Sequence, residues 1–150
     1  GPKSDAGSCP STERARPSEM IDYRENQQLD PAAVARLFDA SGIVRPTSDI
    51  PRIARMFANA NLVISAWDGL RLVGVSRALT DFSYCCYLSD LAVDADYQKR
   101  GIGQELLRRT QSLAGDEVTL ILLSAPGAMA YYPKVGLAQA DNAFVLRRKR

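Results

Sequence analysis

The sequence predicts one α/β domain of the α+β type, built around a central mixed, mostly antiparallel sheet. Three strand-like runs between residues 62 and 93 are joined by connections too short for crossovers, so they must run antiparallel. A strand, a polar loop, a helix and a further strand follow between residues 84 and 123, which makes a crossover with two parallel strands. Two helix-start signals precede these elements, and 150 residues suffice for one core without disulfides or metal.

The N-terminal elements are a strand and two helices. Residues 20–25 alternate well enough for a first strand. A helix is expected over 30–42, because Asp30 is a good N-cap and Pro31 suits the first helical position. A second helix over 48–60 begins in the same way. The loop between these two helices is free to face a ligand.

The rest of the chain alternates apolar runs with turn signals. Asp68-Gly69 is a hairpin signal, and the continuous apolar run over 118–123 suits a strand covered on both faces. In order, we expect strands over 62–67, 72–79 and 84–93, a helix over 101–113, a strand over 118–123, a short helix near 128–135 and a last strand over 144–146.

Residues 1–19 are expected to form a leader outside the domain, because they are polar, small and aperiodic. The Gly1-Pro2 start without Met resembles the remnant that a protease leaves when it removes an expression tag. Met20 is then a candidate native start. The predicted organisation is a leader over 1–19 and a single domain over 20–150.

The composition excludes several classes of site. The chain has no His, which removes Ser-His-Asp and Cys-His catalysis and His metal ligands. Its three cysteines, Cys9, Cys85 and Cys86, lack zinc spacing, and neighbours on a strand point to opposite faces. We therefore expect no metal, buried side chains for Cys85 and Cys86 with no bridge between them, and a reducing, cytoplasmic setting.

The net charge of +2 comes from the C-terminal end of the chain. Residues 147–150 are Arg-Arg-Lys-Arg, whereas the body of the domain is nearly neutral and does not favour nucleic acid as a partner. No apolar run reaches the ~18–20 residues of a membrane span. The basic tail is expected to be a solvated strand end, and a tether to an anionic partner such as RNA is the alternative.

The segment from Gln98 to Gly103 is the part of the sequence that points to a ligand. Gly101 and Gly103 let a ligand approach the backbone with no Cβ in the way. They stand at the start of a predicted helix, where N–H groups lack intrahelical partners and the helix dipole favours anions. Lys99 and Arg100 add two positive charges. The segment therefore predicts a phosphate site, suited to a pyrophosphate.

Neither common nucleotide motif accounts for this segment. The dinucleotide fingerprint requires a third glycine where Leu106 stands, together with a doubly wound parallel sheet. A P-loop requires Gly-Lys followed by Ser or Thr, which is absent here. If the Gly-x-Gly pattern is considered alone, the alternative to a phosphate site is a loop made flexible by its glycines ahead of an ordinary helix.

The surrounding residues resemble the acetyl-CoA motif of the GNAT superfamily of N-acyltransferases. Its core, Gln/Arg-x-x-Gly-x-Gly/Ala, is met by Gln98, Gly101 and Gly103. The segment Ala130–Leu137, Ala-Tyr-Tyr-Pro-Lys-Val-Gly-Leu, looks like the family's Phe-Tyr-x-Lys-hydrophobic-Gly-Phe. The order of the predicted elements also fits, so the chain is similar to a GNAT N-acetyltransferase over nearly its whole domain.

The resemblance implies the GNAT fold, with six to seven strands in the central sheet and about four helices flanking it. It also implies a V-shaped splay between the strands near 84–93 and 118–123. Two residues depart from the family pattern: Pro133 interrupts the short helix, and Leu137 replaces the usual aromatic residue. Both departures concern the angle of that helix.

The resemblance also implies which residues hold acetyl-CoA. Backbone groups of the strand that ends at Val93 would pair with the pantetheine arm as though it were a further strand. The side chain of Gln98 would support the turn, and Tyr132 would lie beside the sulfur. The expected cofactor-binding residues are Leu91, Ala92, Val93, Gln98, Lys99, Arg100, Gly101, Ile102, Gly103, Gln104 and Tyr132.

The expected reaction is direct acetyl transfer to a primary amine, without a covalent enzyme intermediate. The leaving thiolate must gain a proton, and a tyrosine with a pKa near ~10 stays protonated at neutral pH. On the family match, Tyr132 is the expected general acid. The base stays open: Asp90 is a candidate if a bulge resets its side of the strand, and a water chain through Ser89 or Tyr87 is the other.

Two classes of function remain. The first is an acetyl-CoA-dependent N-acetyltransferase whose acceptor is an amine of a small molecule or a protein. The second is a CoA-binding sensor or interaction module with little turnover, which the absence of a clear strand carboxylate favours. Asp81 and Arg45 are candidates for contact with the acceptor, although nothing in the sequence fixes this. The acceptor and a homodimer are left open.

Overall fold

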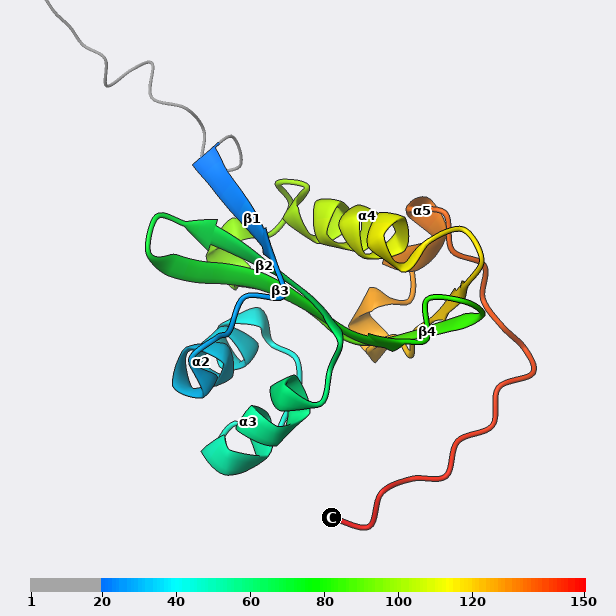
Figure 1. Ribbon diagram of the computed structural model, residues 1–150, viewed down its shortest axis with the longest axis horizontal. Coiled ribbons are helices and arrows are strands. Elements are labelled where there is room, and N and C mark those ends of the chain that lie inside the picture. Colours follow the sequence, from blue (N-terminus) through cyan, green and yellow to red (C-terminus); the bar gives the residue numbers. More distant parts are fainter. Residues whose placement is uncertain (1–19) are drawn as a thin grey trace, which may run out of the picture.

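The computed structural model describes residues 20–150, and the predicted leader over 1–19 lies outside the described residues. Its strands form one sheet in the order β1-β2-β3-β4-β5 (Figure 1). The first four pair antiparallel, and β5 is parallel to β4. The strands are β1 (Ile21–Glu25), β2 (Leu62–Asp68), β3 (Arg71–Thr80), β4 (Cys85–Val93) and β5 (Thr119–Ile121).

Helices cover both faces of this sheet, so the predicted mixed architecture is confirmed (Figure 1). One face carries α2 (Pro31–Ser41) and α3 (Ile50–Ala58), and the other carries α4 (Ile102–Ala114) and α5 (Tyr131–Lys134). A 3₁₀ turn, η2 (Ala95–Tyr97), precedes α4. A second 3₁₀ turn, η3 (Pro126–Ala128), precedes α5.

Side-chain caps explain where α2 and α3 begin. Asp30 accepts a hydrogen bond from the N–H of Ala32 at 3.1 Å, and Asp49 accepts one from the N–H of Arg52 at 3.1 Å. Each cap satisfies a backbone donor that has no partner within its helix. Gly42 ends α2 with a left-handed φ of 89°, which glycine adopts without a steric penalty.

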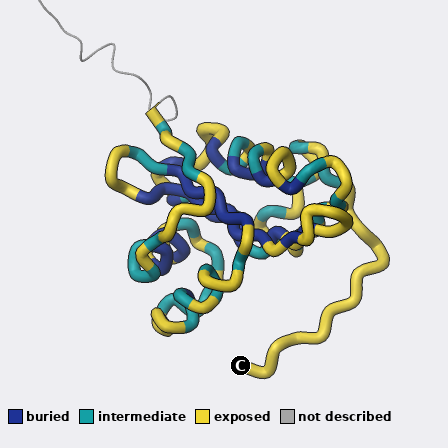
Figure 2. Tube along the Cα trace, viewed as in Figure 1, coloured by how far each residue is buried: buried dark blue, intermediate teal, exposed yellow. Residues whose placement is uncertain are grey.

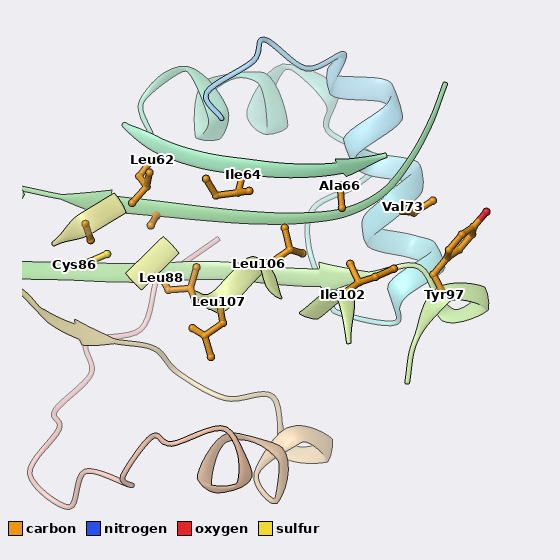
Figure 3. Packing of buried hydrophobic residues seen from close by; sticks show 12 residues of the cluster. Leu62, Ile64, Ala66, Val73, Cys86, Leu88, Tyr97, Ile102, Leu106 and Leu107 are labelled. Carbon is orange, nitrogen blue, oxygen red and sulfur yellow. The ribbon is translucent and has the colours of Figure 1, made fainter. Parts of the chain in front are cut away.

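A separate hydrophobic cluster lies on each face of the sheet, and Figure 3 shows the one next to α4. The cluster between the sheet and α4 includes Ile64, Ile102 and Leu106, all at most 1% exposed. Helix α4 packs tightly here because β3 carries Gly74, where a Cβ would lie only 3.1 Å from Leu106 Cδ1. The opposite cluster is centred on Phe38 and joins α2 and α3 to the sheet.

A bulge in β4 changes which of its residues face α2 and α3. Successive residues of β3 pair with Asp90 and then with Leu88, so Ser89 is the extra residue. Before the bulge, Leu88 packs in the α4 cluster; after it, Ala92 packs in the cluster with α2 and α3. The bulge therefore places Asp90 on the α2–α3 side of the sheet. A bulge of this kind was the condition under which Asp90 was a candidate base.

The predicted last strand is wrong. Residues 144–146 form no strand, and the sheet of the described residues has five strands rather than six to seven. Phe144 and Leu146 are 97% and 99% exposed. The neighbouring edge strand β5 is only three residues long, so it offers few backbone groups with which a further strand could pair.

The prediction that residues 118–123 are covered on both faces is also wrong. Ile121 and Leu123 are 52% and 51% exposed, on the side away from the α4 cluster. Cys85 is exposed on β4, whereas Cys86 is buried as expected. The reason is that α2 and α3 pack over β2, β3 and the end of β4 and leave this end of the sheet bare (Figure 2).

Candidate active site

The predicted splay between β4 and β5 is the centre of the candidate site. The two strands pair only between Cys85–Tyr87 and Thr119–Ile121. Along Leu88–Val93, no strand of the described part of the chain pairs with that edge of β4. Backbone groups on this edge are therefore available to an extended ligand, in the manner of strand addition.

The loop between β4 and α4 is held in place by its own side chains. Asp94 accepts hydrogen bonds from the Asp96 N–H at 2.9 Å and from the Arg71 guanidinium at 2.9 Å. The ring of Tyr97 is buried, and its hydroxyl donates to Asp68. These contacts fix the loop before any ligand is present, which reduces the entropy lost on binding.

The Gln98 side chain supports the turn, in the place that the motif assigns to it. Its amide nitrogen donates to the Val93 carbonyl at 2.8 Å and to the Ser41 carbonyl at 3.3 Å, joining the loop to β4 and α2. Lys99 and Gly101 follow with left-handed φ values of 67° and 84°. Residues in this conformation turn backbone N–H groups into an anion-binding concavity.

Helix α4 begins at this turn without a side-chain cap. Its N-cap residue is Gly101, and the first intrahelical bond runs from the Glu105 N–H to the Gly101 carbonyl at 3.0 Å. The N–H groups of Ile102, Gly103 and Gln104 consequently have no acceptor within the helix. Three donors at the positive end of a helix dipole form an arrangement that suits a diphosphate.

The second glycine of the motif lies where the two motifs meet. A Cβ on Gly103 would lie 3.4 Å from the Tyr131 hydroxyl oxygen and 3.6 Å from Val93 Cγ2. The Tyr131 hydroxyl therefore lies beside the start of α4, which itself adjoins the end of β4. Sequence reasoning gave Tyr131 no role, and its only signal was the pairing with Tyr132.

Tyr132 lies next to it in α5, a single helical turn. The two tyrosine rings meet edge to face with centroids 5.2 Å apart. Burial raises the pKa of the Tyr132 hydroxyl above its usual 10.0, and the neighbouring Tyr131 raises it further. Pro133 costs α5 no hydrogen bond, because it lies in the first turn, where N–H groups have no intrahelical acceptor.

A shallow groove of about 320 Å³ runs along α4 beside the turn. Glu105 within it accepts hydrogen bonds from Arg108 at 2.7 Å and Arg109 at 2.6 Å, and these guanidinium groups lower its pKa from 4.5 to about 2. Glu105 and Arg108 are the two charged residues of the groove lining, so the lining carries one charge of each sign. The lining consists of Gly101, Gln104, Glu105, Leu107, Arg108, Gln111 and Val135.

Asp90 lies across the sheet from this groove and is fully buried between two guanidinium groups. Arg45 Nε donates to one carboxylate oxygen at 2.6 Å, and Arg77 Nε donates to the other at 2.5 Å. Ser89 completes the cluster: its carbonyl accepts from Arg45 and its hydroxyl from Arg77, both at 2.9 Å. The cluster joins the α2–α3 loop to the bulge of β4.

We expect removal of the Asp90 carboxylate to destabilise the fold. In Asp90→Ala, two guanidinium groups with side chains 30% and 10% exposed would lose their counter-charge. Loss of one partner from a buried ion pair typically costs ~3 kcal/mol of unfolding free energy, measurable by urea denaturation. The matched control is Asp22→Ala, which removes an ion pair with Arg24 at a carboxylate 60% exposed and should cost under ~1 kcal/mol. Equal losses in the two variants would contradict the buried role.

Asp81 has a local role in the turn between β3 and β4. One of its carboxylate oxygens accepts from the N–H groups of Ser83, Tyr84 and Cys85 at 2.9, 2.7 and 3.0 Å. These backbone bonds, led by the one from Cys85, lower the pKa of Asp81 from 3.8 to about 2. One oxygen of the carboxylate thus stabilises the turn.

Among residues 20–150, no group of three or more Cys, Asp and Glu side chains is placed to hold a metal ion. No helix in that part of the chain is both long enough and apolar enough to cross a bilayer.

The structure thus brings the glycine turn and the tyrosine segment together, and it places the candidate base Asp90 apart from them. The turn at Gly103 meets α5 at Tyr131, beside the open edge of β4. Asp90 instead points to the α2–α3 side, into a cluster of charged groups. Sequence reasoning did not find Arg77 as its partner, because residues 13 positions apart meet only through strand pairing.

The family model described as "Acetyltransferase (GNAT) domain" matches residues 38–147 of this chain. A search of curated proteins finds no match.

Solved acetyltransferase structures share the fold. A candidate acetyltransferase from Deinococcus radiodurans R1 is 26% identical, with a TM-score of 0.74 over 89% of this chain and 92% of that one. An aminoglycoside acetyltransferase from an uncultured soil metagenomic sample, in complex with sisomicin, is 17% identical, with a TM-score of 0.65 over 90% and 99%. An aminoglycoside N-acetyltransferase in complex with CoA is 13% identical, with a TM-score of 0.66 over 87% and 95%.

Proposed function

Because this chain belongs to the GNAT acetyltransferase family, we propose that it moves an acetyl group from acetyl-CoA directly to a primary amine. One observation carries the proposal. The Tyr131 hydroxyl lies 3.4 Å from the position of a Gly103 Cβ, so the glycine turn and the tyrosine segment adjoin at the splayed edge of β4. The glycine turn and the segment that carries the proposed proton donor, Tyr132, are thus neighbours.

The residues present fit acetyl-CoA, since the turn offers unpaired N–H groups where a side chain would block the approach. Backbone N–H groups from Lys99 to Gln104 would hold the diphosphate, and backbone groups of Leu91–Val93 would pair with the pantetheine arm. Arg108, 62% exposed on the groove, can attract the remaining phosphate. The bound coenzyme supplies an activated acetyl thioester.

Tyr132 is the proposed general acid. Its raised pKa keeps the hydroxyl protonated throughout the neutral range, so that it can donate to a thiolate leaving group. A base must also remove a proton from the amine, and the candidate carboxylate, Asp90, is not free to do so. Both oxygens of Asp90 already accept from guanidinium groups, so a water chain through Ser89 or Tyr87 is the better supported route.

The aminoglycoside enzymes among the structural neighbours favour a small-molecule amine as acceptor over a protein. The proposal is tested by thiol release from acetyl-CoA across a panel of small amines, with binding of acetyl-CoA measured in parallel by calorimetry. Amine-dependent release is the expected result. Tight binding of acetyl-CoA without thiol release for any amine would contradict the enzyme activity and favour a CoA-binding sensor.

A further inference from the structure

One row of apolar side chains on the sheet is left uncovered by the helices and strands of residues 20–150. Leu79 of β3 pairs with Tyr87 of β4, and Tyr87 pairs with Ile121 of β5, so the three side chains lie side by side. They are 41%, 42% and 52% exposed. We call Leu79, Tyr87 and Ile121 the apolar row.

The apolar row lies on the α2–α3 side of the sheet, opposite α4 and the turn at residues 98–104 that is proposed to bind the coenzyme. The neighbours of Tyr87 and Ile121 along their strands pack into the α4 cluster, so these two side chains point the other way. On β3, Leu79 stands two residues after Arg77, which contacts the α3 residue Phe57. If the thioester lies in the splay, as the proposed function requires, an amine arriving from the α2–α3 side passes over this row.

Charged groups stand at both ends of the row: Asp81 in the β3–β4 turn at one end, and the cluster of Arg45, Arg77 and Asp90 at the other. Arg45 and Arg77 share the single carboxylate of Asp90, which leaves one positive charge. The Arg45 side chain is 30% exposed, and three of its five N–H groups are used, one each by Asp90, Val44 and Ser89. Its remaining N–H groups can bind an anion from solvent.

The C-terminal segment adds charge of the same sign on this side. It leaves α5, runs past the end of the sheet and returns on the side of α2 and α3 (Figure 1). The carbonyl of Arg150 there accepts a hydrogen bond from the Arg52 guanidinium of α3 at 3.1 Å. The end of the basic segment 147–150 therefore lies beside α3, and it adds positive charge on the α2–α3 side of the sheet, which repels polycations.

We propose that the acceptor is a monoamine that carries an apolar or aromatic group and a carboxylate, and that a polycationic amine is excluded. The apolar row receives the hydrophobic group, and Arg45 binds the carboxylate. This inference rests on the proposed function, because it uses the position of the thioester in the splay.

The first test compares three ligands on protein loaded with CoA, by calorimetry. L-phenylalanine has all three predicted groups, phenethylamine lacks only the carboxylate, and an aminoglycoside is polycationic. We expect phenylalanine to bind at least ~10-fold more tightly than phenethylamine, the usual worth of a charge-assisted hydrogen bond, and the aminoglycoside to bind most weakly. Equal binding of the first two, tightest binding of the aminoglycoside, or no binding at all would each overturn the inference.

The second test uses variants. Arg45→Gln should weaken the binding of phenylalanine about 10-fold and leave the binding of phenethylamine unchanged. The double variant Leu79→Ser/Ile121→Ser should weaken the binding of both ligands by a similar factor. The controls are Arg36→Gln on the exposed side of α2 and Leu70→Ser in the β2–β3 turn, where Leu70 is 99% exposed. If the double variant dissociates a dimer in sedimentation without changing ligand binding, a second copy covers the row and the inference is wrong.

Acetyl transfer to the same ligands separates this inference from the proposed function. Selective binding of phenylalanine without any acetylation would contradict the proposed enzyme activity but support the proposed ligand site. Efficient acetylation of the aminoglycoside alone would confirm the enzyme and overturn the acceptor class.

Discussion

A Gly103→Glu variant is expected to bind acetyl-CoA at least ~100-fold more weakly than the parent chain, a loss of about 2.7 kcal/mol. The first atom of the new side chain would lie 3.4 Å from the Tyr131 hydroxyl, so the rest of it must extend into the approach to the helix start. Its carboxylate would also occupy the N–H groups of α4 and repel a diphosphate. Calorimetry with acetyl-CoA measures the change directly.

Two matched variants separate charge from position. Ser112→Glu adds the same charge to an exposed site on α4, nine residues later, and should change the affinity by less than about threefold. Gly103→Ala places a Cβ at ordinary contact distances of 3.4 and 3.6 Å and should have a modest effect. Affinity that survives in Gly103→Glu would mean that the coenzyme does not approach this turn.

Tyr132→Phe should lower kcat about 100-fold while the Kd for acetyl-CoA changes little. The substitution keeps the ring that packs edge to face on Tyr131 and removes only the hydroxyl proton. Loss of a general acid costs roughly 10²–10⁴-fold in rate. Because burial raises the pKa of this hydroxyl above 10.0, parent activity should not fall through loss of this proton until the pH exceeds 10.

The control for this experiment is Tyr84→Phe, which removes the hydroxyl of a tyrosine 80% exposed in the β3–β4 turn. It should leave kcat unchanged. Tyr131→Phe adds a comparison, since the Tyr131 hydroxyl lies against Gly103 and its loss should alter coenzyme affinity more than kcat. A kcat loss in Tyr131→Phe with none in Tyr132→Phe would assign the acid to the other tyrosine.

Much of the fold was predictable because its signals are short in range. Asp30 and Asp49 cap their helices within three residues, and the Asp68-Gly69 turn defines a hairpin locally. The glycine turn was found for the same reason, since Gly101 and Gly103 create its backbone geometry without help from distant residues. The Gly103 and Tyr132 segments were nevertheless assigned to one site only through the family resemblance.

The errors share the opposite cause, because each depends on contacts between distant parts of the chain. The run over 118–123 is apolar throughout, but whether a helix covers its second face is decided by the length and position of α2 and α3. The apolar residues of 144–146 read as a strand, yet a strand exists only where a neighbour offers backbone groups.

The sequence by itself determined the types of the elements up to β5 and the glycine turn before α4, since these follow from periodicity, caps and glycine conformation. The tyrosine segment was recognised only from its resemblance to the GNAT family. The tertiary structure decided the environment of each side chain. It buried Asp90 between Arg45 and Arg77, placed the Tyr131 hydroxyl at Gly103, and left the outer face of β5 bare. Burial and charge pairing arise from residues far apart in the chain, and only the folded arrangement of strands and helices brings those residues into contact.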